Sequence, residues 1–206
     1  MSIQSLFITQ LLRDSFTQES GWAELNTDLE QACLQVAEDD EAGQKWCDEN
    51  GYDGYTSYAS LNDLADRANA FSDLKEMLDA KANDFSTASY MDIGCAKWEM
   101  DSYWINILNP LAAHSGHIHP HSVISGTYYV KTPEGAGALK LEDPRLAMMM
   151  NAPGPNKDAP RSAQRFVYEK PEPGTVMMWE SWLRHEVTAN MGEDLRISIS
   201  FNYSLI

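Results

Sequence analysis

The sequence predicts a mainly β protein with N-terminal helices, and three observations lead to this fold class. Six segments after residue 96 alternate apolar or aromatic residues with polar ones, which is the pattern of half-buried strands. Turns that carry proline or glycine separate most of these segments, and no helical pattern lies between them, which favours an antiparallel sandwich or barrel over a parallel α/β sheet. The first 95 residues show helical periodicity instead.

We expect residues 1–206 to form a single domain, with residues 1–95 as a helical N-terminal layer and residues 96–206 as the β core. A chain of 206 residues has the usual length of one domain. Hydrophobic residues make up 43% of the chain and charged residues 22%, which are ordinary values for a folded globular protein.

The N-terminal layer is expected to contain one short strand and two helices. Residues 3–11 fit a short strand. An amphipathic helix is expected to follow Asn26, its predicted N-cap, and to end near Asn50 and Gly51, because glycine favours the end of a helix. A second helix starts at Ser72, and the sequence GYDGYTSYASL between the two helices is typical of a loop.

The β core is expected to begin with a strand in KWEMDSYWINIL, which follows the change of pattern near residue 96. Five further segments show the same alternation. They are SVISGTYYV (122–130), ALKLE (138–142), RFVYE (165–169), TVMMW (175–179) and RISISFNYS (196–204).

Acidic residues are concentrated in the N-terminal half. The chain has 31 acidic and 15 basic residues and a formal charge of −16, and residues 1–100 contain 20 of the acids and 6 of the bases. Such a charge repels phosphate backbones, so the sequence argues against nucleic-acid binding. All five histidines follow residue 100, so we expect the chemistry to lie in the second half.

Histidines are clustered in HSGHIHPH, which carries four of them between residues 114 and 121. In an extended chain His117 and His119 point to the same side, so both imidazoles can reach one metal ion. His185 follows the TVMMW strand and is the expected third ligand, whereas His114 and His121 are expected in loops or behind the ligands. Three histidines suit zinc, copper or nickel as well as iron, so the ligand set alone leaves the metal open.

Arg196 opens the last strand, on which Arg196, Ser198, Ser200 and Asn202 share one face. This row is polar enough to line a pocket. A guanidinium buried there requires an anionic partner, because leaving it desolvated and unpaired would cost several kcal/mol. A dicarboxylate fits, with one end on the metal and the other paired with Arg196 and hydrogen-bonded by Ser198.

Five motifs in order, HIHP, SGTYYV, DPR, SWLRH and RISISFN, resemble those of an uncharacterised bacterial and phage family of 2-oxoglutarate/Fe(II)-dependent oxygenases. The resemblance covers roughly residues 95–206. It implies a double-stranded β-helix (a cupin-like jelly roll), with iron(II) and 2-oxoglutarate as cofactors. It places His117, His119 and His185 on the metal positions, which are also the catalytic positions. Arg196, Ser198 and Tyr129 fall on the positions that bind the cosubstrate.

The activity implied by this resemblance is that of a hydroxylase-type dioxygenase, which couples substrate oxidation to oxidative decarboxylation of 2-oxoglutarate to succinate. The sequence departs from the wider superfamily at His119, where a carboxylate is usual. Two alternatives therefore stay open. One is a three-histidine cupin-like dioxygenase that does not use 2-oxoglutarate, and the other is a non-catalytic jelly roll that binds a metal or ligand.

The sequence also bears on compartment and partners. It has no apolar run near the roughly 20 residues of a membrane span, no signal-peptide pattern, and only three scattered cysteines, so we expect a cytoplasmic protein without a membrane partner. The prime substrate, a small molecule or a protein, is not indicated. Exposed edge strands of sandwiches often pair, which makes a homodimer one expectation.

Overall fold

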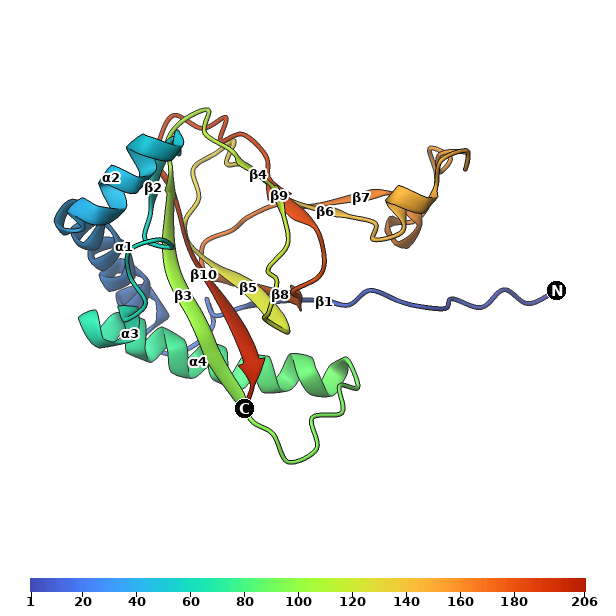
Figure 1. Cartoon of the computed structure of the whole chain (residues 1–206), viewed down its shortest axis with the longest axis horizontal. Coiled ribbons are helices and arrows are strands. Elements are labelled where there is room, and N and C mark those ends of the chain that lie inside the picture. The colour runs from blue at the N-terminus through green and yellow to red at the C-terminus, as the bar shows by residue number, and fades with distance from the viewer.

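The computed structural model describes all 206 residues and consists of two antiparallel sheets with helices over one of them (Figure 1). The strands are β1 (Leu11–Ser15), β2 (Gly54–Thr56), β3 (Trp98–Leu108), β4 (His114–His117), β5 (Ile124–Lys131), β6 (Leu139–Glu142), β7 (Phe166–Glu169), β8 (Thr175–Glu180), β9 (His185–Val187) and β10 (Arg196–Leu205). The helices are α1 (Trp22–Asp39), α2 (Glu41–Asn50), α3 (Leu64–Arg67) and α4 (Asn69–Ala88), with short 3-10 turns at Leu146–Met148 and Arg161–Ala163.

The larger sheet has the order β1-β8-β5-β10-β3-β2, and the smaller has the order β4-β9-β6-β7. Every pair of neighbours is antiparallel. Two facing antiparallel sheets with this crossing connectivity form the double-stranded β-helix that the resemblance implied, so the predicted fold class is confirmed.

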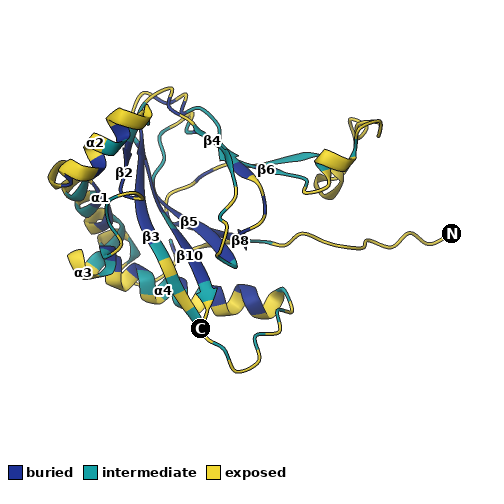
Figure 2. Ribbon diagram, in the orientation of Figure 1, coloured by how far each residue is buried: buried dark blue, intermediate teal, exposed yellow.

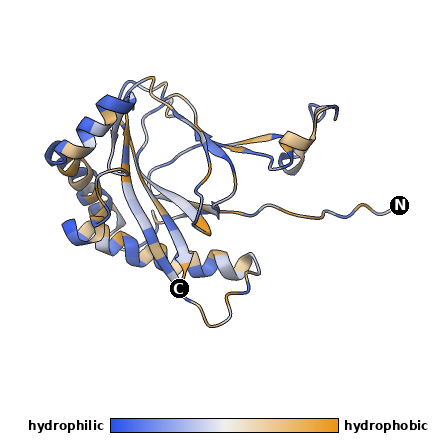
Figure 3. Ribbon diagram, in the orientation of Figure 1, coloured by the Kyte–Doolittle hydropathy of each residue, from blue (hydrophilic) through white to orange (hydrophobic).

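The main core lies between the helices and the outer face of the larger sheet. Leu29 of α1 and Leu78 of α4 pack there against residues such as Ile199 and Phe201 of β10, and all four are fully buried. Figure 2 shows the long central strands as buried, and Figure 3 shows that α1 and α4 carry both hydrophobic and hydrophilic positions, as expected for helices with one face on a sheet.

A second, smaller core lies between the two sheets. It contains Tyr129, Leu139, Leu141, Met177, Trp179 and Leu183. The alternation of β10 connects the two cores, because Ile197, Ile199 and Phe201 face the helices while Arg196, Ser198 and Ser200 line a cavity between the sheets.

Several predicted element boundaries were wrong. Residues 3–10 form no strand, and β1 begins only at Leu11, where the chain first pairs with β8. The expected helix over residues 26–50 is two helices, because Asp40 ends α1 and caps α2 by accepting from the Gly43 backbone N–H. Asn26 is no N-cap but lies inside α1, where its amide donates to the Val130 carbonyl.

Other differences concern short elements. The expected loop after Gly51 contains β2, and α4 begins at Asn69 rather than Ser72. The strands β4, which carries His114 and His117, and β9, which begins at His185, were not predicted, because neither HSGH nor HEV alternates apolar and polar residues as the predicted strands do. No helix combines the length and apolar character that crossing a membrane requires.

Candidate metal and cosubstrate site

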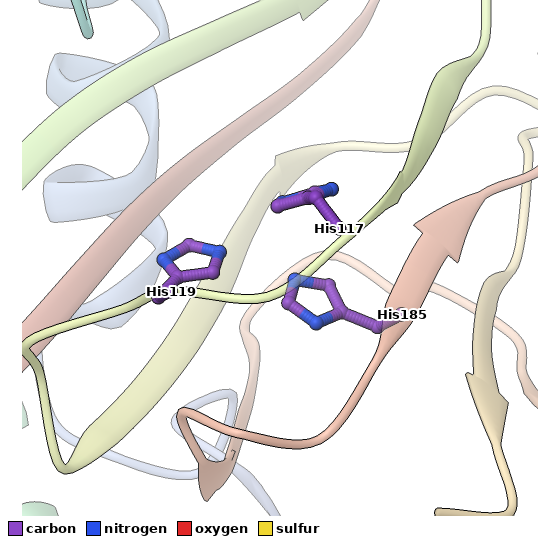
Figure 4. A group of neighbouring side chains, drawn as sticks. All are labelled: His117, His119 and His185. Carbon is purple, nitrogen blue, oxygen red and sulfur yellow. The ribbon is translucent and has the colours of Figure 1, made fainter.

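Pairing of β4 with β9 brings the three predicted histidines together. In this antiparallel pair His117 lies directly opposite His185. His119 follows β4, and its backbone N–H donates to the Ser181 carbonyl at 3.0 Å, which holds the segment beside the turn before β9. One ring nitrogen from each histidine lies within 4.8 Å of the others, and Figure 4 shows the three rings grouped, two from one segment and one from the neighbouring strand.

Hydrogen bonds orient two of the three imidazoles so that Nε2 is free. The Nδ1 atom of His117 lies 2.7 Å from the Ser115 carbonyl oxygen, and that of His185 lies 2.9 Å from the Leu183 carbonyl oxygen. A carbonyl oxygen only accepts, so each Nδ1 carries the proton and each Nε2 keeps a lone pair. The Asn202 side chain acts on the ring of His119 and raises its pKa against the larger effect of burial, and the buried Nε2 of His119 has no partner.

Burial keeps these histidines neutral. Desolvation lowers the pKa of His185 to about 3 and that of His119 to about 4, and in both the neighbouring His117 adds to the shift. The pKa of His117 is also lowered, mainly by burial. Neutral imidazole is the form that binds a metal ion. Three converging, neutral histidines, one with an unpartnered buried nitrogen, therefore fit a divalent metal.

Arg196 is a buried cation without an acidic partner. Its Nε donates to the Gly137 carbonyl at 3.3 Å and its Nη1 to Ser198 Oγ at 3.1 Å, but no carboxylate pairs with the guanidinium. Burial lowers the pKa of Arg196, because desolvation disfavours the charged form of the guanidinium. An anion that enters beside this group is the partner it lacks.

Tyr129 completes the anion-binding end of the cavity. The guanidinium Cζ lies 5.1 Å from the centre of the Tyr129 ring, and the buried Tyr129 hydroxyl has no hydrogen-bond partner among protein groups. Arg196, Ser198 and Tyr129 all line the cavity that also contains the three histidines. The structure therefore places every predicted site residue around one space of about 480 Å³, part of which is open to solvent.

Two tryptophans form the walls beside the histidines. The Trp104 ring lies 5.6 Å from that of His119, and the Trp179 ring lies 4.8 Å from that of His185, measured between ring centres. Both tryptophans are buried, and they give the cavity an apolar lining around its polar groups.

Sequence reasoning missed several lining residues. His114, expected in a loop, lies on β4 and stacks on His117 with ring centres 4.6 Å apart. Tyr52 and Asn106 also line the cavity, and the Tyr52 hydroxyl donates to Asn106 Oδ1 at 3.3 Å. Asn106 had a detectable signal, since it is the one amide in the apolar end of the β3 sequence, whereas Tyr52 lies in a segment without periodicity. His121 is exposed and does not line the cavity.

Comparison with known families agrees with this geometry. Residues 102–202 match the family model described as "Putative 2OG-Fe(II) oxygenase". The match covers 101 of the 206 residues and nearly the whole β core. The chain is accordingly an iron(II)- and 2-oxoglutarate-dependent oxygenase, as the sequence resemblance implied. The two alternatives left open by the sequence are disfavoured, because Arg196 is buried and faces the same cavity as the histidines.

Several solved structures have a similar fold at low sequence identity. A prolyl-4-hydroxylase from Pseudomonas putida is 12% identical with a TM-score of 0.56, covering 95% of this chain and 92% of that one. A Trichoplax adhaerens prolyl hydroxylase in complex with a hypoxia inducible factor peptide fragment is 13% identical with a TM-score of 0.58, covering 94% and 82%. HygX from Streptomyces hygroscopicus, with nickel and 2-oxoglutarate bound, is 11% identical with a TM-score of 0.57, covering 96% and 82%. No curated protein matches the sequence.

Proposed function

We propose that this oxygenase is a hydroxylase-type enzyme in which His117, His119 and His185 hold iron(II). Arg196, Ser198 and Tyr129 bind the distal carboxylate of 2-oxoglutarate. The observation that carries the proposal is the buried Arg196 guanidinium, which has no acidic partner and opens onto the cavity that contains three free Nε2 atoms. A dicarboxylate that reaches both ends of this cavity satisfies both groups at once.

The residues of this chain position and enclose the reactants. Iron(II) with 2-oxoglutarate supplies dioxygen chemistry that oxidises the substrate and converts the cosubstrate to succinate and carbon dioxide. Ser198 accepts a hydrogen bond from Arg196 and so fixes the fork of the guanidinium toward the cavity. Trp104 and Trp179 exclude bulk water from the histidine end, which strengthens the electrostatic contacts there.

Arginine substitution tests this assignment. 2-Oxoglutarate is titrated anaerobically into iron(II)-loaded protein, and binding is followed by the visible charge-transfer band of the chelate and by calorimetry. Arg196→Ala is expected to weaken binding roughly 30-fold or more, because removing one partner of a buried charge pair costs about 2–5 kcal/mol.

Arg145→Ala is the matched control, because Arg145 is exposed and pairs only with Asp143 outside the cavity. Its affinity for 2-oxoglutarate should equal that of the unsubstituted protein. Iron binding with no chelate band at any 2-oxoglutarate concentration would contradict the assignment of Arg196 and its neighbours.

We further propose a prime substrate that is a small molecule or a protein rather than a nucleic acid or membrane, and a cytoplasmic location. The charge of −16 opposes binding to polyanions, and the three cysteines are free thiols, which suits a reducing compartment. A homodimer is proposed on the general tendency of exposed edge strands to pair, and light scattering of the purified protein tests it.

A further inference from the structure

The cavity contains no acidic side chain. The chain has 31 aspartates and glutamates, yet none of the 17 residues that line the cavity is among them. Arg196 is the only arginine, lysine, aspartate or glutamate among the residues of the lining. All acidic side chains of this strongly acidic protein therefore lie outside the cavity lining.

The charges in the cavity do not balance when both cofactors are counted. A divalent metal and Arg196 supply three positive charges, and 2-oxoglutarate supplies two negative ones. A carboxylate ligand would cancel the remaining charge, but His119 stands in the position where a carboxylate is usual and contributes none. One positive charge therefore remains in a largely buried space, where an unpaired charge is strongly disfavoured.

An unpartnered hydrogen-bond donor lies at the same end of the cavity. The Trp179 side chain is buried beside His185, and its Nε1–H has no acceptor among protein groups. An indole N–H can only donate, so a ligand oxygen is required to satisfy it. Buried donors without partners are uncommon in folded proteins, and Trp179 differs from Trp98, whose Nε1–H also lacks a partner, because Trp179 lines the cavity.

We propose that the prime substrate carries a carboxylate or a comparable monoanionic oxygen group, which binds at the histidine end of the cavity and accepts from Trp179. This inference rests on the proposed function, because it counts iron(II) and 2-oxoglutarate as present. The anionic group balances the remaining positive charge, and its oxygen supplies the acceptor that Trp179 lacks. The excess charge follows from His119, so it is specific to this ligand set.

Two small probes of the same shape test the charge requirement. Acetate and acetamide are titrated anaerobically into the iron(II) complex at saturating 2-oxoglutarate, with calorimetry and tryptophan fluorescence as readouts and the chelate band as a check that the cosubstrate stays bound. Acetate is expected to bind saturably and to shift the band without removing it, whereas acetamide should not bind.

Substitutions at Trp179 and His119 test the roles of these two residues in binding the anionic group. Trp179→Phe should weaken acetate binding roughly tenfold or more, which is the order expected for loss of one hydrogen bond to a charged group. Trp182→Phe is the matched control, because Trp182 is 47% exposed and does not line the cavity. His119→Asp, which restores a carboxylate, should bind metal and 2-oxoglutarate but lose the preference for acetate over acetamide.

Three results would overturn the inference. In the first, iron(II) and 2-oxoglutarate bind normally but acetate binds no better than acetamide. In the second, acetate binds only by displacing the cosubstrate, so that the chelate band disappears. In the third, chloride saturates the same site and blocks acetate, so that an inorganic ion supplies the charge. If wild-type protein binds neither iron(II) nor 2-oxoglutarate, the proposed function itself fails and this inference with it.

Discussion

At the scale of single residues, Asn202 stands out because it makes His119 different from the other two histidines. His117 and His185 donate Nδ1–H to backbone carbonyls, whereas the side chain of Asn202 acts on His119 and raises its pKa against the larger effect of burial. Asn202 is buried, and its Oδ1 accepts from Ser125 Oγ at 2.7 Å, which fixes the direction of the amide. A substitution can remove the Asn202 side chain but not the backbone carbonyls that bind His117 and His185. The orientation of His119 can therefore be tested separately from that of the other two histidines.

Asn202→Leu is expected to weaken metal binding by about 10- to 100-fold, which is the usual effect of losing a group that orients a metal ligand. Asn202→Asp keeps an acceptor and should stay close to wild type. Nickel(II) affinity by calorimetry measures the loss, and nitrogen-15 NMR of the zinc-loaded protein reports which ring nitrogen of His119 carries the proton. Ser204→Ala is the control from the same strand, and equal metal affinity in all four proteins would refute the role of Asn202.

At the scale of elements, the junction between α1 and α2 depends on Asp40. The Asp40 carboxylate accepts from the Gly43 backbone N–H at 3.0 Å, from the Tyr55 hydroxyl at 2.8 Å and from the Ser60 hydroxyl. A side chain at residue 43 would collide with this carboxylate, since a Cβ there would lie 2.2 Å from Asp40 Oδ2. One buried acid thus caps α2 and ties it to β2 and the following turn.

Low pH should remove the contribution of the ionised Asp40 carboxylate to the stability of the protein, over a defined range of pH. Burial alone would raise the pKa of Asp40, but hydrogen bonds from Ser60, Gly43 and Tyr55 outweigh it and lower the pKa. A lowered folded-state pKa stabilises the protein fully above the unfolded value of about 3.9, and the stabilisation is lost as the pH falls through the folded value.

Asp40→Ala should therefore lower the free energy of unfolding by about 0.5–2 kcal/mol at pH 7, as is usual for loss of a helix cap, with a smaller difference from wild type below about pH 4. Urea unfolding between pH 7 and pH 3 measures both effects. Asp48→Ala is the control, since Asp48 is exposed on α2. A difference that stays constant over this range would show that the ionised carboxylate contributes nothing.

At the scale of the whole molecule, the larger sheet separates the structural core from the site. Its outer face packs against the helices, and its inner face lines the cavity, so stability and binding depend on different residues of the same strands. The N-terminal half also contributes to the site, because Tyr52 lines the cavity and Thr56 donates to Asn106 at 3.0 Å.

Leu78→Ala separates these two roles. Leu78 is fully buried between α4 and the sheet, so its truncation should lower the free energy of unfolding by about 2–5 kcal/mol. The affinity of the folded protein for 2-oxoglutarate should not change, because Leu78 does not line the cavity. Chemical denaturation and calorimetry measure the two quantities, with Leu34→Ala as the exposed control. A loss of affinity in folded Leu78→Ala protein would show that the two faces are coupled.

The sequence by itself determined the class of fold, most strands of the β core and the residues grouped at the site. Alternation in RISISFN assigned Arg196 and Ser198 to one face and Ile197 and Ile199 to the other, because side chains alternate along any strand. The spacing of His117 and His119 likewise predicted that both could reach one metal ion, and the structure brings them together with His185.

Only the tertiary structure decided which distant residues pack against each face of these strands. Strands β4 and β9 exist because they pair with each other across about 70 residues, not because of a local pattern. The break of the first helical segment at Asp40 depends on Tyr55 and Ser60, which lie 15 and 20 residues away. His114, Tyr52 and Trp179 became site residues for the same reason: local periodicity specifies the side on which a residue lies, whereas packing between distant segments specifies its neighbours.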